Sequence, residues 1–392
     1  MTEGAPPGEP PAPVAPRAAP RATPAERDRL RSDFVRLCEI ASPSFRERPA
    51  ADWVAGELRA LGLEVHEDAS AGETGCDAGN LLARIPGPPG ARTILLCAHL
   101  DTVPLAAPVE VVERDGVLTN ANDAILGADN KAAVAAFLGV ARRLARGPAP
   151  AGVELLFTTA EEPGLIGAKA FDRGLLQSEV GYVFDHASPI GELVVAAPTY
   201  YRVDAEFRGQ SAHAGIRPED GRSAIAAAAQ GIARLELGRI DDRTTANAGT
   251  IEGGSARNVV AEHCRVALET RSLDHDRASE ALTAMVDVMT EAASDGECDV
   301  ELTVEEVCRA YRLARSAPVV EIAAAALGAL GIEAVPISTG GGSDASVLHA
   351  RGLPCLNVAN GTLANHEPDE RVSVHDLDTA LDLALGLVAH AA

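Results

Sequence analysis

The chain has 392 residues and a formal net charge of −23, with 46% hydrophobic and 23% charged residues. A chain of this length exceeds one ordinary hydrophobic core, so two domains are expected. The acidic excess disfavours nucleic acid and anionic membranes as partners, and the sequence lacks the run of about 18 apolar residues that marks a transmembrane helix.

The seven cysteines favour a reducing compartment. Their number is odd and none are spaced as Cys-x-x-Cys, which disfavours both a disulfide framework and a structural zinc ribbon. Cys97 and Cys355 lie in apolar runs and are expected to be small buried hydrophobic residues. We therefore predict a cytoplasmic protein.

The N-terminal end is rich in proline and alanine, and we predict that residues 1–22 form a disordered tail. The apolar segment of a signal peptide does not follow it. The first helix begins at Thr23, because Thr23 and Glu26 can form a capping box with Pro24 at the first helical position. A second helix is predicted over residues 49–61.

Strands and helices then alternate. Fully apolar strands are predicted at residues 93–98, 153–158 and 180–184, with an alanine-rich helix at 131–146. Strands without polar alternation need cover on both faces, as parallel sheets have. The pattern predicts an α/β fold with a doubly wound, mostly parallel sheet.

The pattern changes after residue 197, where strands begin to alternate polar and apolar residues, as half-buried antiparallel strands do. The order strand–helix–strand–strand–helix–strand predicts a split β-α-β, ferredoxin-like α+β domain. The α/β pattern resumes with helices at residues 319–330 and 374–389. We therefore predict a catalytic domain of residues 23–197 and 310–392, with residues 198–309 inserted as a dimerisation or lid domain.

Metal-ligating residue types follow several of the predicted strands. The carboxyl ends of parallel strands share one sheet edge, so these side chains should converge there. A mixture of two imidazoles and several carboxylates suits zinc, cobalt or manganese. The candidates at the strand ends, at a helix start and in a late loop are His99, Asp101, Asp129, Glu161, Glu162, Asp185, His186 and His366.

The spacing of these candidates along the sequence suggests a role for some of them. His99 and Asp101 are two residues apart, so both side chains face one side, and the carboxylate can orient a metal-bound imidazole. Glu161 and Glu162 are adjacent, so one can bind metal while the other handles a proton, as hydrolytic sites require. Either Asp185 or His186 can be a ligand. Taken singly, each residue also has an ordinary structural explanation, such as an acid at a helix start.

Taken together, the motifs resemble those of the M20 family of dinuclear zinc peptidases and amidohydrolases, most closely its peptidase T-like branch. The resemblance extends from about residue 25 to residue 392, with the motifs in the family's order. They are His99-Leu100-Asp101-Thr102-Val103-Pro104, Gly127-Ala128-Asp129-Asn130-Lys131, Ala160-Glu161-Glu162, Phe184-Asp185, Gly209-Gln210-Ser211-Ala212-His213-Ala214-Gly215, Gly253-Gly254-Ser255-Ala256-Arg257-Asn258-Val259-Val260, Gly341-Gly342-Ser343-Asp344-Ala345 and His366-Glu367-Pro368.

The resemblance implies two zinc ions per chain, with cobalt or manganese as alternatives. His99 and Asp185 would bind one metal, Glu162 and His366 the other, and Asp129 would bridge them. The order of the motifs thus implies ligands drawn from five separate segments of the chain.

The resemblance also implies catalytic roles. Asp101 would orient His99. Glu161 would act as the base that deprotonates a bridging water, and would then deliver the proton to the leaving amine.

Substrate contacts are implied in the same way. His213, from a partner subunit in a homodimer, would steady the oxyanion. Asn258 and Arg271 would bind a substrate carboxylate, and Gly341 and Gly342 would let the backbone approach the substrate.

The predicted function is hydrolysis of the peptide bond in di- or tripeptides. An N-acyl or N-carbamoyl amino acid amidohydrolase is the first alternative, since it would use the same metals and differ in its pocket. A non-catalytic dimeric binding protein on the same fold is a remote alternative, because it would require loss of Glu161 or of a ligand, and none is missing.

Overall fold

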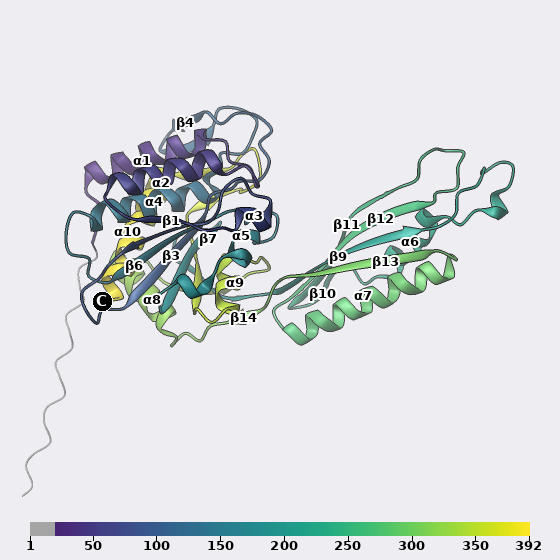
Figure 1. The fold of residues 1–392 in the computed structure, drawn as a ribbon. Helices are drawn as coiled ribbons and strands as arrows, with labels where there is room; N and C mark the ends of the chain where they lie inside the picture. Colours follow the sequence, from purple (N-terminus) through teal and green to yellow (C-terminus); the bar gives the residue numbers. More distant parts are fainter. Residues whose placement is uncertain (1–19) are drawn as a thin grey trace, which may run out of the picture.

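The computed structural model describes residues 20–392, which form the two bodies seen in Figure 1, each built around its own main sheet. The large sheet has the strand order β1-β2-β6-β3-β7-β16-β8-β14, with β15 also paired to β8. Its strands are β1 (Val65–Glu67), β2 (Leu81–Ile85), β3 (Thr93–His99), β6 (Gly152–Thr158), β7 (Val180–His186), β8 (Glu192–Ala197), β14 (Tyr311–Arg312), β15 (Val335–Ser338) and β16 (Cys355–Ala359). A four-stranded sheet lies beside it, with β4 (Val111–Arg114), β5 (Val117–Asn120), β17 (Thr362–Leu363) and β18 (Arg371–Ser373).

The centre of the large sheet is parallel and its edges are mainly antiparallel. Strands β6, β3, β7 and β16 run parallel to one another, whereas β1, β2 and β14 pair in the antiparallel sense, as do β16 and β8. The predicted apolar strands occupy this parallel centre because both of their faces are covered. The fold is therefore mixed α/β around a parallel core.

Helices cover both faces of the large sheet. On β3, Ile94 and Leu96 pack into the larger apolar cluster, whereas Leu95 and Cys97 pack into a smaller one on the opposite face. The larger cluster takes residues from α1, α2, α4, α8 and α10, and the smaller one takes residues from α9. The helices of this body are α1 (Pro24–Glu39), α2 (Arg48–Ala60), α3 (Ala71–Thr74), α4 (Ala128–Leu144), α5 (Ile166–Ala170), α8 (Pro318–Leu330), α9 (Asp344–Ala350) and α10 (Val374–His390).

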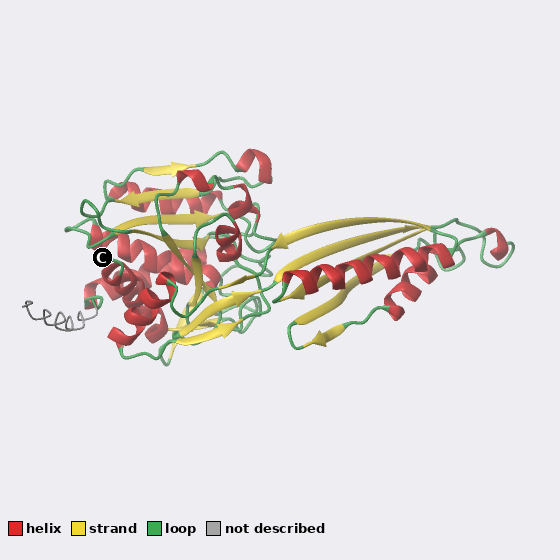
Figure 2. Ribbon diagram, turned by 90° about the horizontal axis from the view of Figure 1, so that it is seen from below, coloured by secondary structure: helices red, strands yellow, loops and turns green. Residues whose placement is uncertain are grey.

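The second body is an antiparallel sheet in the order β10-β11-β12-β9-β13. Cys264, Val266 and Leu268 of β12 face inward onto α6 and α7, which lie together on one side of the sheet (Figure 2). Apart from the edge strand β10, this is the connectivity of a ferredoxin-like unit. Its elements are β9 (Thr199–Arg208), α6 (Ala224–Arg234), β10 (Gly238–Asp241), β11 (Thr244–Gly253), β12 (His263–Ser272), α7 (His275–Asp295) and β13 (Asp299–Cys308).

The chain enters and leaves this second body at one place. Tyr200 at the start of β9 pairs with Cys308 at the end of β13, and Ala197 of β8 pairs with Tyr311 of β14 in the large sheet. Residues 199–308 are therefore held to the large sheet by two neighbouring crossings, near the edge strands β8 and β14.

Most of the predicted elements have counterparts in the structure. The capping box between Thr23 and Glu26 is present at the start of α1. All seven cysteines are free, with Cys97 and Cys355 fully buried. The described residues include no helix with the length and apolar character needed to cross a membrane. Strands β8 and β15 were not predicted, because short runs of mixed valine, alanine and proline carry no clear period.

The predicted tail lies largely outside the described residues, which begin at residue 20. Its last residues are part of the fold: Ala22 is buried, and its N–H donates to Asp382 Oδ1 at 2.6 Å. Asp382 also pairs with Arg27 at 2.9 Å and lies 3.7 Å from Arg21. This buried carboxylate therefore ties the N-terminal segment to α10.

We expect Asp382→Asn to lower the free energy of unfolding by roughly 2–4 kcal/mol, because it leaves Arg27 without one of its two carboxylates in a buried setting. Urea unfolding followed by circular dichroism measures the change. Asp287→Asn on the exposed face of α7 is the matched control and should have no effect. Equal stability of the two variants would show that Asp382 contributes little.

Candidate active site

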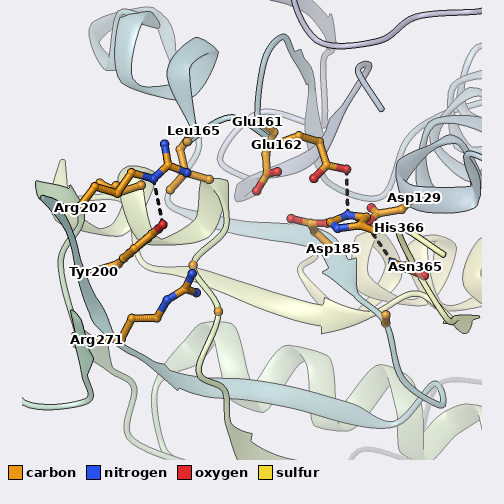
Figure 3. Close-up of a pocket in the computed structure, with 15 residues that line it drawn as sticks. Asp129, Glu161, Glu162, Leu165, Asp185, Tyr200, Arg202, Arg271, Asn365 and His366 are labelled. Carbon is orange, nitrogen blue, oxygen red and sulfur yellow. Dashed lines mark hydrogen bonds and ion pairs between the residues drawn. The ribbon is translucent and has the colours of Figure 1, made fainter. Parts of the chain in front are cut away.

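The carboxyl ends of the central strands meet at one edge of the large sheet. Strand β3 ends at His99 and β7 at His186, and β6, which ends at Thr158, adjoins β3 on its other side. The candidate residues lie at these strand ends or in the segments that follow, and Figure 3 shows five of them turned toward one another: Asp129, Glu161, Glu162, Asp185 and His366. Parallel pairing therefore brings together side chains that are far apart in the sequence.

His99 lies at the centre of the group and is 1% exposed. Its Nδ1 is 3.0 Å from the backbone oxygen of Asp101, so in the tautomer that carries the proton on Nδ1 this N–H donates to that carbonyl. Nε2 is then 3.1 Å from Asp129 Oδ1 and 3.5 Å from Asp185 Oδ1. In that tautomer the Nε2 lone pair faces carboxylate oxygens, an all-acceptor arrangement that suits a cation.

The two neighbours at the end of β7 face different ways. Asp185 faces His99, and its backbone N–H donates to Asn357 Oδ1 at 3.0 Å. His186 Nε2 instead lies 3.6 Å from Glu192 Oε2, outside the group. The geometry therefore favours Asp185 over His186 as a ligand.

His366 approaches the group from the loop before β18, where its φ is 67°. Its Nε2 is 3.0 Å from Glu162 Oε1 and 3.4 Å from Asp129 Oδ2 (Figure 3). Asn365 also donates to Asp129 Oδ2 at 2.8 Å. Asp129 thus lies between the two histidines, with one oxygen toward each.

Two buried carboxylates hold the loop that carries Glu161 and Glu162. Asp101 accepts the backbone N–H of Glu161 at 3.0 Å and that of Glu162 at 3.3 Å. Glu47 accepts the N–H of Ala160 at 3.0 Å, and Ala160 has a φ of 46°. Three successive backbone donors are thereby fixed, which orients both glutamates.

A third carboxylate, Glu370, holds the turn that carries Asp129. Its two oxygens accept the N–H of Gly127 at 2.7 Å and of Asp129 at 2.9 Å. The peptide bond between Asp129 and Asn130 is cis. The first turn of α4 is thus fixed to the loop that follows His366.

The electrostatics of the site favour a bound cation. Burial, followed by the negative charge of Asp185, raises the pKa of Glu161 well above its usual range. Burial likewise raises the pKa of Asp185 to about 7. Hydrogen bonds to Asp129 and Glu162 raise the pKa of His366 to about 10. The group therefore contains more carboxylates than its two histidines can neutralise, and a bound cation would balance the remaining negative charge.

Two sets of donor atoms are close enough to hold metal ions. In each set the donor atoms lie within 4.8 Å of one another, and both sets include His99. The first adds Glu161 and Asp185, and the second adds Asp129 and Glu162. Imidazole nitrogen and carboxylate oxygen are the ligands that zinc, cobalt and manganese accept, so the residues fit such ions.

One wall of a cavity of about 340 Å³ is formed by Asp129, Glu161, Glu162, Asp185 and His366. The opposite wall carries Tyr200, Arg202 and Arg271, which come from the second body (Figure 3). Gly341 and Gly342 also line the cavity. A volume near the lower end of known ligand sites suits a small substrate.

Arg271 and Gly342 are closely packed in this wall. Arg271 is paired to Glu269 through two hydrogen bonds of 3.1 and 3.0 Å, and its guanidinium lies 3.9 Å from the Tyr200 ring centroid. A Cβ on Gly342 would lie 2.6 Å from Cys308 Sγ, whereas one on Gly341 would meet only Thr339 at 3.7 Å. The absence of a side chain is therefore required by packing at Gly342.

His213 and Asn258 lie away from the cavity. Their segments adjoin each other, with Ala214 N–H donating to Asn258 O at 2.9 Å. His213 follows the Arg208 end of β9, whereas Tyr200 at the cavity is near the other end. A ten-residue strand spans about 30 Å, so neither residue reaches the cavity of its own chain.

Several residues of the site were missed by sequence reasoning. They share no recognisable spacing, because each is a single polar residue in a loop or strand whose partner lies far away in the chain. Among them, Asn365 could have been suspected from the sequence, because it is adjacent to the candidate ligand His366. The missed residues are Glu47, Tyr200, Arg202, Asn365 and Glu370.

Comparisons with known proteins agree with this architecture. Residues 95–390 match the profile described as Peptidase family M20/M25/M40. The Bacillus subtilis (strain 168) protein YqjE, described as uncharacterized, is 34% identical over 365 residues, covering 93% of this chain and 98% of that protein. Two crystal structures are each 34% identical in sequence to this chain, and each match covers 93% of this chain and 98% of the other protein's chain. They are an aminopeptidase PepT from Bacillus cereus ATCC 10987, with a TM-score of 0.83, and a tripeptidase from Staphylococcus aureus, with a TM-score of 0.87.

Proposed function

The chain belongs to peptidase family M20/M25/M40 and is a hydrolytic enzyme, and on that premise we propose that it cleaves the peptide bond of di- and tripeptides with two zinc ions. The observation that carries this proposal is the pair of donor sets that share His99, one with Glu161 and Asp185 and the other with Asp129 and Glu162. The four carboxylates of these sets line a cavity of about 340 Å³. Cobalt or manganese suits the same ligands.

We assign His99 and Asp185 to one ion, Glu162 and His366 to the other, and Asp129 to both. This assignment rests on the two oxygens of Asp129, which face different histidines at 3.1 and 3.4 Å. When bound, such ions polarise a substrate carbonyl and make water acidic enough to react near neutral pH.

Glu161 is proposed as the proton carrier. Its backbone is fixed by Asp101, and its carboxylate lies beside the donor atoms of His99 and Asp185. From this position Glu161 can accept a proton from the attacking water and pass it to the nitrogen of the leaving amine. Asp101, through its carbonyl bond to His99, keeps the imidazole in the required tautomer.

The opposite wall is proposed to bind the rest of the substrate. Arg271 offers a cation there for the substrate's terminal carboxylate, and Gly341 leaves its backbone open to the cavity. The free thiols of all seven cysteines support a reducing cytoplasm as the location.

We propose a homodimer, in which His213 of one chain steadies the oxyanion in the other chain's cavity and Asn258 assists in binding the substrate carboxylate. The position of both residues at the far end of the second body supports this arrangement, since they cannot serve their own cavity.

His213→Ala is expected to lower kcat by roughly 10²-fold with little change in metal content, because the oxyanion loses a donor. Mixing this variant with Glu161→Gln gives a sharper result. In a mixed dimer, one cavity has an intact Glu161 and receives an intact His213, so mixing two impaired proteins should restore part of the activity. Full activity of His213→Ala alone would refute the role of His213.

The function itself is tested by metal analysis together with a substrate panel. We expect about two zinc-like ions per chain and release of amino acids from di- and tripeptides. Turnover of only N-acyl or N-carbamoyl amino acids would retain the mechanism and replace the substrate. Failure to bind metal after reconstitution would refute the catalytic proposal.

A further inference from the structure

The cavity has two cations on one wall, and they differ in their partners. Both guanidinium groups lie against the same ring, at 3.9 Å for Arg271 and 5.3 Å for Arg202 from the Tyr200 centroid. Arg271 already has a carboxylate partner, since its Nε and Nη2 donate to Glu269, and its Nη1 donates to Gly340 O at 3.1 Å. Two of its five N–H groups remain for a substrate carboxylate. Arg202 has no carboxylate within ion-pairing distance among residues 20–392.

Arg202 lacks a carboxylate partner although two glutamates lie close to it. The residues directly opposite Arg202 in the sheet are Glu269 on β12 and Glu305 on β13. Glu269 binds Arg271, and Glu305 pairs with Lys169 at 2.8 Å. Both cross-strand carboxylates are thus engaged elsewhere, in a chain with a net charge of −23.

Arg202 is nevertheless fixed in place. Its Nε donates to the Tyr200 hydroxyl at 2.8 Å, and its Nη1 donates to Pro163 O, in the loop just after Glu162. A Cβ on Gly164 would lie 2.8 Å from Nη1, so the glycine gives this side chain its room. With Nε and Nη1 bonded, Nη2 has no acceptor within residues 20–392.

A partly buried cation without an anion is costly unless a ligand supplies the charge. We propose that Arg202 binds a second carboxylate of the substrate, beside the terminal carboxylate at Arg271, so that the enzyme prefers short peptides with an acidic C-terminal residue. This inference rests on the proposed function. It adds a specificity-determining residue to the cavity wall opposite Glu161 (Figure 3).

The test compares two matched tripeptides, Ala-Ala-Glu and Ala-Ala-Gln, which share the terminal carboxylate and differ in one side-chain charge. For the unaltered enzyme we expect kcat/KM to favour the glutamate peptide by about tenfold, as one charge-assisted bond gives. In Arg202→Gln the ratio should fall to about one, and in Arg202→Lys it should be intermediate. Arg208→Gln, on the same strand at its exposed far end, should leave the ratio unchanged.

Two results would overturn the proposal. One is an unaltered enzyme that cleaves both peptides equally well. The other is an Arg202→Gln variant that loses activity on both peptides by the same factor, which would make Arg202 a structural contact to Pro163 O only. If the unaltered enzyme cleaves neither peptide, the proposed function fails instead, so the two failures are distinguishable.

Discussion

Glu161→Gln should lower kcat by roughly 10²- to 10⁴-fold while the protein retains its metal. The amide has the volume of the carboxylate but cannot accept a proton, so the substitution removes general acid–base transfer alone. The backbone N–H of Glu161 still donates to Asp101, so the loop keeps its position. Steady-state kinetics with a cleaved tripeptide, together with elemental analysis, measure both quantities.

Glu333→Gln provides the control, because it makes the same chemical change at an exposed position far along the chain. It should match the unaltered enzyme in rate and metal content. Turnover retained in Glu161→Gln would remove Glu161 as the base, and joint loss of metal and activity would make it a ligand instead.

Asp129→Asn should reduce both metal content and activity. The substitution keeps the shape of the side chain and a bond to Asn365, but it removes the negative charge that lies between His99 and His366. We expect fewer than the roughly two ions of the unaltered enzyme and a loss of about a thousandfold or more in kcat/KM.

Asp123→Asn is the matched control for this substitution, since it lies in the same segment and is exposed. Circular dichroism and elemental analysis on both variants separate misfolding from loss of metal. A full complement of ions in Asp129→Asn, with unchanged turnover, would contradict a bridging role.

Local sequence patterns predicted much of the fold. The capping box at Thr23 fixed the start of α1, and the alternation from Cys264 to Leu268 identified a half-buried strand and its inward face. The strand ends at His99 and Asp185 were predicted because a polar residue after an apolar run marks the edge of a parallel sheet. Each of these signals depends only on residues that are neighbours in the sequence, so the sequence alone is enough to detect it.

The rest of the site depends on contacts between distant segments. Glu47 and Ala160 are 113 residues apart, and Glu370 and Asp129 are 241 residues apart, so no spacing could reveal either pair. Arg202 was missed because a charged residue on a half-buried strand is ordinarily exposed to solvent. Its proposed role depends on the contact between the start of β9 and the loop after Glu162, which only the structure shows.

The two neighbouring crossings between the sheets have a consequence for how the chain folds. Strands β8 and β14 pair across more than a hundred residues of intervening chain, from Ala197 to Tyr311. Closing so long a loop costs conformational entropy, by an amount that grows with the logarithm of its length. Once β9 and β13 pair, with Tyr200 beside Cys308, the ends of that loop are already adjacent. If the antiparallel body forms early, it therefore holds the two ends of this loop together. The remaining entropic cost of pairing β8 with β14 at the edge of the large sheet is then lower.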